Sequence, residues 1–414
     1  MTSTAWDFTP PTPSELEDRE VPLLGTHLQG RRIALLVSGG IAAMKAPLVV
    51  RALRRQGAEV VVFASREALR YVTAETLAWA SVHPVATELT AEAEHLSDAA
   101  PFDAYLLAPA TYNSINKLAH GIADTVVTAA LASALGRLAE GRTKVLIAPT
   151  MHGSLHTPIL AASLRALAGY GVRVIPPRDD YGKHNLPAEE VLVAEVCRAL
   201  ARSPLAGRAI LTTGGPTPVP IDGVRRLTNI FTGELGSRIA EELYLRGANV
   251  EHVHGLSSFS PPAWLPHTVV STYDEYRQHV HTRLAARRFA AGVFSAGVAD
   301  YAPTVVLPGK TPSGGALAQI DLRPLPKVID EVRSAHPELY MVTFKYQENL
   351  THEELLVIAR ERLSDYPLVV ANRGEEKGPH GEQVAHLVTR DGEPRRAVGK
   401  RAIAAAIADH LEAV

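Results

Sequence analysis

The sequence has a single cysteine, Cys197, among its 414 residues. One thiol cannot form an intramolecular disulfide, and it cannot build a zinc site from several thiolates, so we expect a reducing compartment. An excess of either charge is also missing, because 42 Lys and Arg residues are balanced by 44 Asp and Glu residues, for a formal net charge of −2. This balance gives no reason to expect nucleic acid or a membrane surface as a partner.

Long apolar runs are missing as well. No stretch approaches the roughly 18 apolar residues that a membrane helix needs. Residues 1–30 lack the basic flank and apolar segment of an export signal, and we therefore expect a cytoplasmic protein. A chain of 414 residues is too long for one ordinary core and fits two domains, since a usual domain has roughly 100 to 200 residues.

The sequence does contain short apolar runs that alternate with longer helical stretches, and the alternation starts twice, near residue 31 and at Gly207. The predicted strands are residues 33–37, 59–64, 104–108, 144–148 and 172–175, then 209–213, 250–253, 291–295, 341–344, 368–371 and 386–389. The predicted helices are residues 47–56, 66–72, 115–119, 126–136, 160–170 and 188–201, then 238–246, 273–288, 352–363 and 400–411. Strand, helix and strand in succession are typical of a parallel sheet.

We predict an α/β fold with two Rossmann-like domains, the second of them built on a parallel sheet. The expected limits are residues 31–203 and 207–414, with residues 1–30 as an N-terminal extension. Residues 305–318 carry Gly and Pro without an apolar period, which predicts a surface loop, and such loops often hold function.

The first predicted strand runs into a Ser-Gly-Gly turn at residues 38–40, before a helix. Backbone N–H groups and the positive end of a helix suit a phosphate at such a place. The turn does not have the GxGxxG pattern, so NAD is not favoured. A second buried strand ends at residue 108 in a polar stretch, and open α/β sheets bind their ligands at this carboxyl edge.

Residues 38–45, 108–124 and 148–152, in this order, resemble the flavin-containing cysteine decarboxylases. In particular they are similar to the decarboxylase half of the bifunctional phosphopantothenoylcysteine decarboxylase and phosphopantothenate–cysteine ligase family of coenzyme A biosynthesis. The resemblance implies FMN as the cofactor and a catalytic histidine that here matches His95, since histidine titrates in the range that a base needs. The resemblance places Ser38, Gly39, Gly40 and Ile41 near the flavin phosphate, Ser65 after the second strand, and Ala110, Thr111 and Asn113 along the flavin.

Two segments of this half differ from the family pattern. Residues 149–152 read Pro-Thr-Met-His where the family has an asparagine for the substrate carboxylate, so His152 in its protonated form is the candidate there. Residues 178–187 correspond to a mobile flap whose cysteine, in the family, protonates an enethiol intermediate, and here they contain no cysteine. Cys197 lies in an amphipathic helical run, which predicts a core position.

Residues 211–236 resemble the ligase that usually accompanies this decarboxylase, in the ordered motif Gly215-Pro-Thr217, Asp222, Val224-Arg225, Asn229 and Thr232-Gly233. The stretch from Thr232 into the following helix offers backbone donors for a triphosphate, and an arginine can fork onto a carboxylate or phosphate. The resemblance implies that Asn229 and Lys310 are catalytic, with Asn229 bonded to an acyl nucleotide. The substrate-binding residues that it implies in this half are Arg225, Thr232, Gly233, Asp300, Phe344, Lys345 and Asn372.

We therefore expect a fused enzyme that joins cysteine to 4′-phosphopantothenate through an acyl nucleotide and then decarboxylates the cysteinyl product with FMN. Triphosphate chemistry implies Mg²⁺ together with CTP, or with ATP instead. The resemblance also implies a homo-oligomer with trimeric decarboxylase contacts and dimeric ligase contacts. Two alternatives stay open: a divergent enzyme of a specialised pathway that acts on another cysteine-like acid and has lost the reductive half, and a non-catalytic flavin-binding partner protein.

Overall fold

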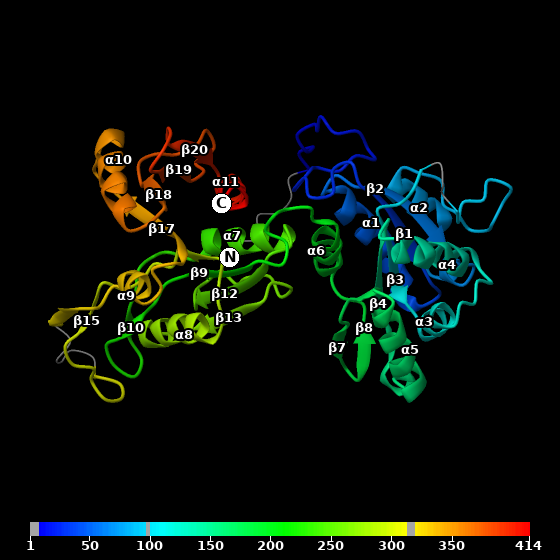
Figure 1. Ribbon diagram of the computed structural model, residues 1–414, viewed down its shortest axis with the longest axis horizontal. Helices are drawn as coiled ribbons and strands as arrows, with labels where there is room; N and C mark the ends of the chain where they lie inside the picture. The colour runs from blue at the N-terminus through cyan, green and yellow to red at the C-terminus, as the bar shows by residue number, and fades with distance from the viewer. Residues whose placement is uncertain (1–7, 97–99, 313–318) are drawn as a thin grey trace. The chain divides into compact units, whose positions relative to one another are not determined.

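The computed structural model describes residues 8–96, 100–312 and 319–414 (Figure 1). Part of the predicted loop at residues 305–318, namely residues 313–318, lies outside the described residues. The chain divides into two compact units, Met1–Leu200 and Ala201–Val414. Each unit carries its own sheet with helices, and the predicted α/β fold is confirmed.

The N-terminal unit is built on a five-stranded parallel sheet with the order β2-β1-β3-β4-β6. The strands are β1 (Arg32–Val37), β2 (Glu59–Ala64), β3 (Ala104–Ala110), β4 (Lys144–Pro149) and β6 (Arg173–Val174). The helices are α1 (Ala46–Arg54), α2 (Ala74–Ser81), α3 (Tyr112–Ala119), α4 (Val126–Ala139), α5 (Pro158–Gly169) and α6 (Glu189–Leu200). All seven residues of β3 are buried, as expected for an apolar strand with helices on both faces of its sheet.

Two features of this unit differ from the sequence-based expectation. The predicted helix at residues 66–72 is only a short 3-10 turn, Ala68–Arg70, and a separate helix, α2, begins after Thr73. Thr73 accepts a hydrogen bond from the N–H of Thr76 and thereby caps α2, which fixes the start of the helix. The second feature is a small antiparallel sheet of β5 (Met151–His152), β8 (Lys183–Asn185) and β7 (Arg178–Asp180), which was not predicted.

The C-terminal unit contains an eight-stranded sheet with the order β13-β12-β9-β14-β17-β18-β19-β20. The first six strands in this order are parallel, whereas β19 and β20 run antiparallel to their neighbours. The strands are β9 (Ala209–Gly214), β12 (Asn249–Gly255), β13 (His267–Val270), β14 (Ala291–Phe294), β17 (Tyr340–Gln347), β18 (Leu368–Arg373), β19 (Val384–Thr389) and β20 (Arg395–Val398). The connections from β18 to β19 and from β19 to β20 contain no helix and are short. Such connections join antiparallel strands, because a parallel neighbour needs a longer crossover.

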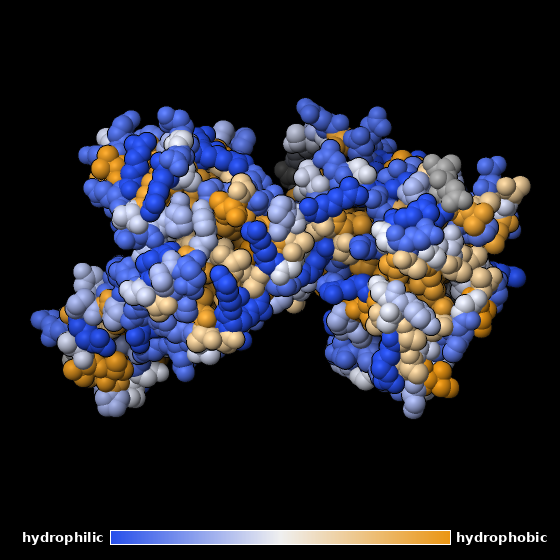
Figure 2. Space-filling view, viewed as in Figure 1, coloured by the Kyte–Doolittle hydropathy of each residue, from blue (hydrophilic) through white to orange (hydrophobic). Residues whose placement is uncertain are grey.

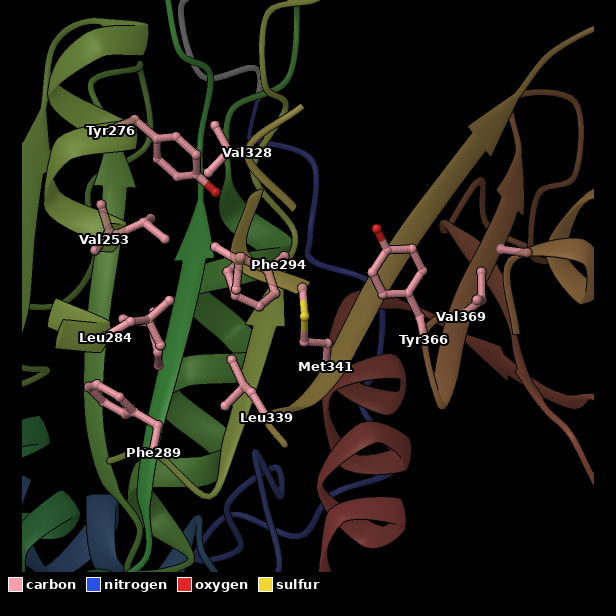
Figure 3. Close-up of a cluster of buried hydrophobic side chains, with 14 of the residues drawn as sticks. Val253, Tyr276, Leu284, Phe289, Phe294, Val328, Leu339, Met341, Tyr366 and Val369 are labelled. Atoms are coloured by element: carbon pink, nitrogen blue, oxygen red, sulfur yellow. The ribbon is translucent and has the colours of Figure 1, made fainter. Parts of the chain in front are cut away.

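Helices and two short ribbons complete the C-terminal unit. The helices are α7 (Glu234–Leu245), α8 (Tyr273–Ala286), α9 (Val328–Ala335), α10 (His352–Glu361) and α11 (Lys400–Glu412). The ribbons pair β10 (Val219–Pro220) with β11 (Arg226–Leu227) and β15 (Tyr301–Pro303) with β16 (Leu322–Pro324). Figure 3 shows part of its core, where Tyr276 and Leu284 of α8 reach toward the strands that carry Val253 and Phe294. Packing of this apolar cluster holds the helices to the sheet.

Figure 2 shows mostly hydrophilic residues on the visible face of the C-terminal unit, whereas the visible face of the N-terminal unit also carries a broader hydrophobic area. Cys197 is buried in α6, in agreement with its predicted core position. Among the described residues, no helix has both the length and the apolar character that a membrane crossing requires.

Helix α10 provides a matched test of this packing. Leu355 is fully buried, whereas Val357, two residues on, is 53% exposed. We expect Leu355→Ala to lower the free energy of unfolding of the C-terminal unit by about 2–5 kcal/mol, because it removes buried methyl groups and leaves a cavity. Val357→Ala is expected to change it by no more than about 0.5 kcal/mol. Denaturant unfolding of the full chain measures both, and equal losses would contradict the observed orientation of α10.

Candidate active sites

The first candidate site lies at the carboxyl ends of β1 and β3, neighbouring strands at which the strand order of the N-terminal sheet reverses. Ser38 follows β1 and is buried. Its Oγ donates to the carbonyl of Pro109 at 2.7 Å, accepts from the N–H of Thr111 at 3.3 Å, and lies 3.2 Å from Thr111 Oγ1. The structure therefore joins two stretches that the sequence singled out separately, at the place where open α/β sheets bind ligands.

The glycine turn after Ser38 packs closely against its surroundings. A Cβ atom on Gly40 would lie 3.2 Å from Thr111 Cγ2, and one on Gly39 would lie 2.3 Å from Glu67 Cβ. Ile41, the next residue, is 68% exposed. The turn thus presents backbone near Thr111, as a phosphate cradle requires.

The other predicted flavin residues lie at the same edge of the sheet. Ser65 directly follows β2, and its N–H donates to the carbonyl of Val37 at 3.1 Å. Ala110 is the buried last residue of β3, and Thr111 caps α3 by accepting from the N–H of Ser114. Asn113 is exposed on the first turn of α3, so its amide can reach a ligand.

His95 and His152 are the two predicted histidines of this half, and their hydrogen bonds differ from those of Ser38 and Thr111. His95 is half-buried, and its Nδ1 is buried without a hydrogen-bond partner among the described residues, which is unusual for a buried polar atom. No hydrogen bond within the described ranges joins it to Ser38 or Thr111. His152 is exposed on β5, and its Nδ1 accepts from the N–H of Ser154 at 3.2 Å. This bond engages Nδ1 within the protein, and the role of His152 at a substrate carboxylate stays a prediction.

The second candidate site lies at the carboxyl ends of β9 and β14, where the strand order of the larger sheet reverses. Gly233 precedes α7 with a φ angle of 78°, and a Cβ atom there would lie 2.2 Å from the N atom of Gly215. A Cβ atom on Gly236 would lie 2.7 Å from the carbonyl oxygen of Thr213. The turn after β9 and the start of α7 therefore touch as bare backbone, which leaves N–H groups for an anion.

Asn229 connects this turn to the end of β14. Its Nδ2 donates to the carbonyl of Gly297 at 2.6 Å, and its Oδ1 accepts from the N–H of Phe231 at 3.1 Å. The ring of Phe231 packs edge-on against Tyr346, with the ring centroids 5.5 Å apart. These contacts bring residues 229–231 to the end of β17.

The remaining predicted residues of this half lie on these strands and their loops. Phe344 and Lys345 are half-buried on β17, and Asn372 is buried on β18 in register with Tyr346. Thr232 is exposed, and its carbonyl accepts from Ser257 Oγ at 2.7 Å.

Asp300 was predicted to contact a nucleotide base. It is more than half exposed, and its carboxylate forms an ion pair with Lys327, a residue that the sequence had not indicated. The structure therefore gives the Asp300 carboxylate a cationic partner within the chain.

Arg225 and the loop of Lys310 are fixed together by a buried carboxylate. Asp222 accepts hydrogen bonds from the N–H groups of Val224, Arg225 and Thr311, and it pairs with Arg225 Nη1 at 2.5 Å. The backbone hydrogen bond from Val224, with those from Arg225 and Thr311, holds the pKa of Asp222 well below its ordinary range. Lys310 is exposed next to Thr311. Arg225 Nη1 is thus engaged within the protein, and Lys310 is presented beside it.

Two histidines of β12 lie behind the glycine turn, and the sequence had not indicated them. His252 Nδ1 lies 2.9 Å from Thr212 Oγ1, and its Nε2 lies 3.3 Å from His254 Nδ1. A Cβ atom on Gly233 would lie 2.7 Å from His254 Cε1. Burial lowers the pKa of His252 to about 3 and lowers that of His254 as well, so both rings are neutral at physiological pH.

His352, Glu376 and His386 form a group whose candidate metal-ligand atoms lie within 4.8 Å of one another. Glu376 already accepts from Arg396 Nε at 3.1 Å and from His386 Nε2 at 2.9 Å. Magnesium prefers oxygen ligands, and two imidazoles with a carboxylate engaged by an arginine do not provide them. We therefore assign no magnesium to this group.

Comparison with known proteins identifies the family. Residues 23–201 match the model of the flavoprotein family, and residues 205–414 match that of the DNA/pantothenate metabolism flavoprotein C-terminal domain. The coenzyme A biosynthesis bifunctional protein CoaBC of Thermococcus kodakarensis is 34% identical over 88% of this chain and 90% of its own length. This chain belongs to the CoaBC family. The CoaBC protein of Bacillus subtilis is 30% identical over 89% of this chain and 93% of its own length.

This chain is also similar to a solved structure, the DNA/pantothenate metabolism flavoprotein from Streptococcus pneumoniae, with a TM-score of 0.44 and 21% identity. The match covers 50% of this chain and 99% of that structure. The family resemblance that the motifs implied is confirmed by the family models and by the CoaBC relatives.

Gly233 and Gly207 provide a matched pair for testing the close backbone contact between Gly233 and Gly215, because both have a φ angle of 78°. A Cβ atom on Gly207 would meet no atom within 4 Å, whereas one on Gly233 would overlap Gly215. We expect Gly207→Ala to lower the free energy of unfolding by about 1–2 kcal/mol, from backbone strain alone. Gly233→Ala is expected to lower it clearly more, as measured by denaturant unfolding of the C-terminal unit. Equal costs would show that the two backbones are not in contact.

The buried histidines predict a pH dependence of stability. As the pH falls below about 6.5, the ordinary pKa of a histidine, the unfolded chain takes up a proton at His252, while the folded chain does not until about pH 3. The free energy of unfolding should therefore decrease as the pH is lowered from about 6.5 to about 3, by up to about 1.4 kcal/mol per pH unit. His252→Gln should reduce this slope, and the exposed His380→Gln should not. Unchanged slopes in both variants would contradict a neutral buried His252.

Proposed function

We propose that this chain catalyses two consecutive reactions of coenzyme A biosynthesis. The C-terminal unit joins cysteine to 4′-phosphopantothenate with a nucleoside triphosphate, and the N-terminal unit decarboxylates the cysteinyl product with a flavin. The observation that carries this proposal is the match, over most of the chain, to coenzyme A biosynthesis bifunctional proteins. These relatives favour neither a specialised pathway nor a non-catalytic flavin-binding role.

In the N-terminal unit, the residues at the first site fit FMN. Gly39 and Gly40 offer backbone N–H groups for its phosphate, and the hydroxyls of Ser38 and Thr111 lie together beside them. A bound flavin supplies an acceptor for the two electrons of thiol oxidation. We assign the base near the reacting carbon to His95, because its buried Nδ1 lacks a partner among the described residues.

In the C-terminal unit, the proposed reaction begins with attack of the phosphopantothenate carboxylate on the α-phosphate of CTP, or of ATP, with loss of pyrophosphate. The amine of cysteine then displaces the nucleotide from the acyl group. The glycine turn at Gly233 receives the triphosphate, Lys310 neutralises its oxygens, and Asn229 holds the acyl nucleotide. Mg²⁺ would be bound largely through the phosphates of the substrate, as is usual for this ion.

We also propose a homo-oligomer, with contacts of one kind between N-terminal units and of another between C-terminal units. Its support is the exposed apolar side chains that each unit carries, since large contiguous groups of such residues mark contact surfaces. Met44 and Leu48 are more than half exposed near the start of α1, and Ile230 and Val224 are 93% and 64% exposed in the C-terminal unit.

A combined assay tests both halves at once. Purified protein is incubated with 4′-phosphopantothenate, cysteine, Mg²⁺ and either CTP or ATP, and pyrophosphate, carbon dioxide and product mass are followed. We expect Thr111→Val to lose bound FMN and carbon dioxide release but to keep pyrophosphate formation. Lys310→Gln should lower pyrophosphate formation about 10²–10³-fold with normal flavin content, since it removes an electrostatic contact to the reacting phosphates.

Lys377→Gln, at an exposed position of the C-terminal unit, controls for the loss of one positive charge. Purified wild-type protein that binds flavin but forms neither pyrophosphate nor carbon dioxide would overturn the proposed function.

A further inference from the structure

The small antiparallel sheet of the N-terminal unit carries a chain of three hydrogen-bonded titratable side chains. His156 Nδ1 lies 2.8 Å from His184 Nε2, and His184 Nδ1 lies 2.5 Å from Asp179 Oδ1. Asp179 belongs to β7 and His184 to β8, while His156 follows the short 3-10 turn after β5. His184 is mostly covered, and His156 is exposed.

The donor and acceptor roles of the three side chains follow from the carboxylate of Asp179 at one end of the series. A carboxylate only accepts, so His184 Nδ1 carries a proton toward Asp179. One proton must also lie between the two rings. When both rings are neutral, His156 Nδ1 donates to His184 Nε2, and His156 Nε2 is left with a lone pair. His156 Nε2 is then a base.

Adding one proton at His156 Nε2 reverses the middle hydrogen bond. The proton between the rings shifts to His184 Nε2, which now donates to His156 Nδ1. His184 is then protonated at both nitrogens, and its positive charge faces the carboxylate of Asp179, where it is stabilised. The three side chains can therefore store one proton that enters and leaves at His156 Nε2.

The position of His156 connects this proton store to the first candidate site. Strand β5 directly follows β4, and the N–H of Thr150, between them, donates to the carbonyl of Ala110 at 2.9 Å. Thr157, next to His156, has its Oγ1 3.3 Å from the hydroxyl of Tyr112, which lies between Thr111 and Asn113. The histidine pair is thus attached to the same sheet edge as the residues proposed for FMN.

A close backbone contact helps to position the three hydrogen-bonded side chains Asp179, His184 and His156, which we call the relay. The N–H of Gly153 donates to the carbonyl of Gly182 at 3.0 Å, and a Cβ atom on Gly153 would lie only 2.4 Å from that oxygen. This contact fixes the β7–β8 hairpin against the turn that carries His156. The relay geometry therefore depends on backbone packing as well as on the three side chains.

We propose that His156 takes the proton of the substrate thiol at Nε2 and returns it to the same sulfur after carbon dioxide has left, with His184 and Asp179 as positioning residues. This inference rests on the proposed decarboxylation. In the first step the S–H bond breaks and an N–H bond forms. A C–H bond of the carbon that bears the sulfur also breaks, a C=S bond forms, and a bound flavin would accept that hydrogen with its electron pair. The bond from carbon to the carboxylate then breaks, and its electron pair stays on the substrate as a thiolate. In the last step the proton moves from His156 Nε2 to the sulfur, and the relay is neutral again.

The first test measures thiol ionisation and does not depend on turnover. The holoenzyme is mixed with 4′-phosphopantetheine, which carries the thiol but no carboxylate, and the ultraviolet absorbance of the thiolate is followed over pH. We expect the wild-type protein to ionise the bound thiol and His156→Gln to leave it protonated. Asp179→Asn should shift the pH profile, because the carboxylate that stabilises charged His184 is gone. Asp180→Asn is the matched control, since Asp180 lies beside Arg178 and not beside either histidine.

The other charged or titratable groups on these three strands are Arg178, Asp180, Lys183 and His152, and all four remain in the His156 and Asp179 variants. His184→Gln serves as a second disruption of the relay. Flavin content and the unfolding midpoint of each variant show whether the site is intact.

The second test follows flavin reduction by 4′-phosphopantothenoylcysteine in a stopped-flow instrument. We expect His156→Gln to slow it about 10²–10⁴-fold, the range of a lost acid–base group, with normal flavin content. A His156→Gln protein that keeps both the thiolate signal and the rate would overturn the relay but not the proposed function. A wild-type protein that releases no carbon dioxide from this substrate would overturn the proposed function itself.

Discussion

Close packing of glycine turns at the carboxyl ends of the central strands is the constraint on which both candidate sites depend. In the C-terminal unit, a Cβ atom on Gly233 would overlap Gly215, and one on Gly255 would lie 1.7 Å from the carbonyl oxygen of Pro216. Glycine is the residue that permits this approach. The first N–H groups of a helix such as α7 have no partner within the helix, and an anion can bind such groups.

The two candidate sites differ in what surrounds their glycine turns. In the N-terminal unit, the hydroxyls of Ser38 and Thr111 bond to each other across β1 and β3 and lie beside the glycine turn. In the C-terminal unit, the turn is bare backbone, and positive charge comes from Lys310 on a loop that Asp222 ties to Arg225. Under the proposed function, a triphosphate carries more charge than a flavin phosphate, and this difference would account for Lys310 at the second site.

The alternation of strands and helices could be predicted from the sequence because each buried strand is a continuous apolar run, as in residues 104–108. The predicted helix at residues 66–72 was wrong because Thr73 caps a later helix. The partners of side chains could not be predicted, because they come from distant parts of the chain. Asp222 and Thr311 are 89 residues apart, and His156 and His184 are 28 residues apart.

The two histidine pairs of this chain show how surroundings decide what a histidine does. His252 and His254 are buried next to hydroxyls and a carbonyl, and none of their hydrogen-bond partners among the described residues is a carboxylate. Desolvation therefore keeps both rings neutral, and they pack behind the glycine turn. His156 is exposed and His184 is mostly covered, and Asp179 accepts the hydrogen bond at the other end of this pair. A carboxylate at one end and solvent at the other allow a proton to enter and be held. The same side chain is therefore structural in one unit and suited to proton transfer in the other.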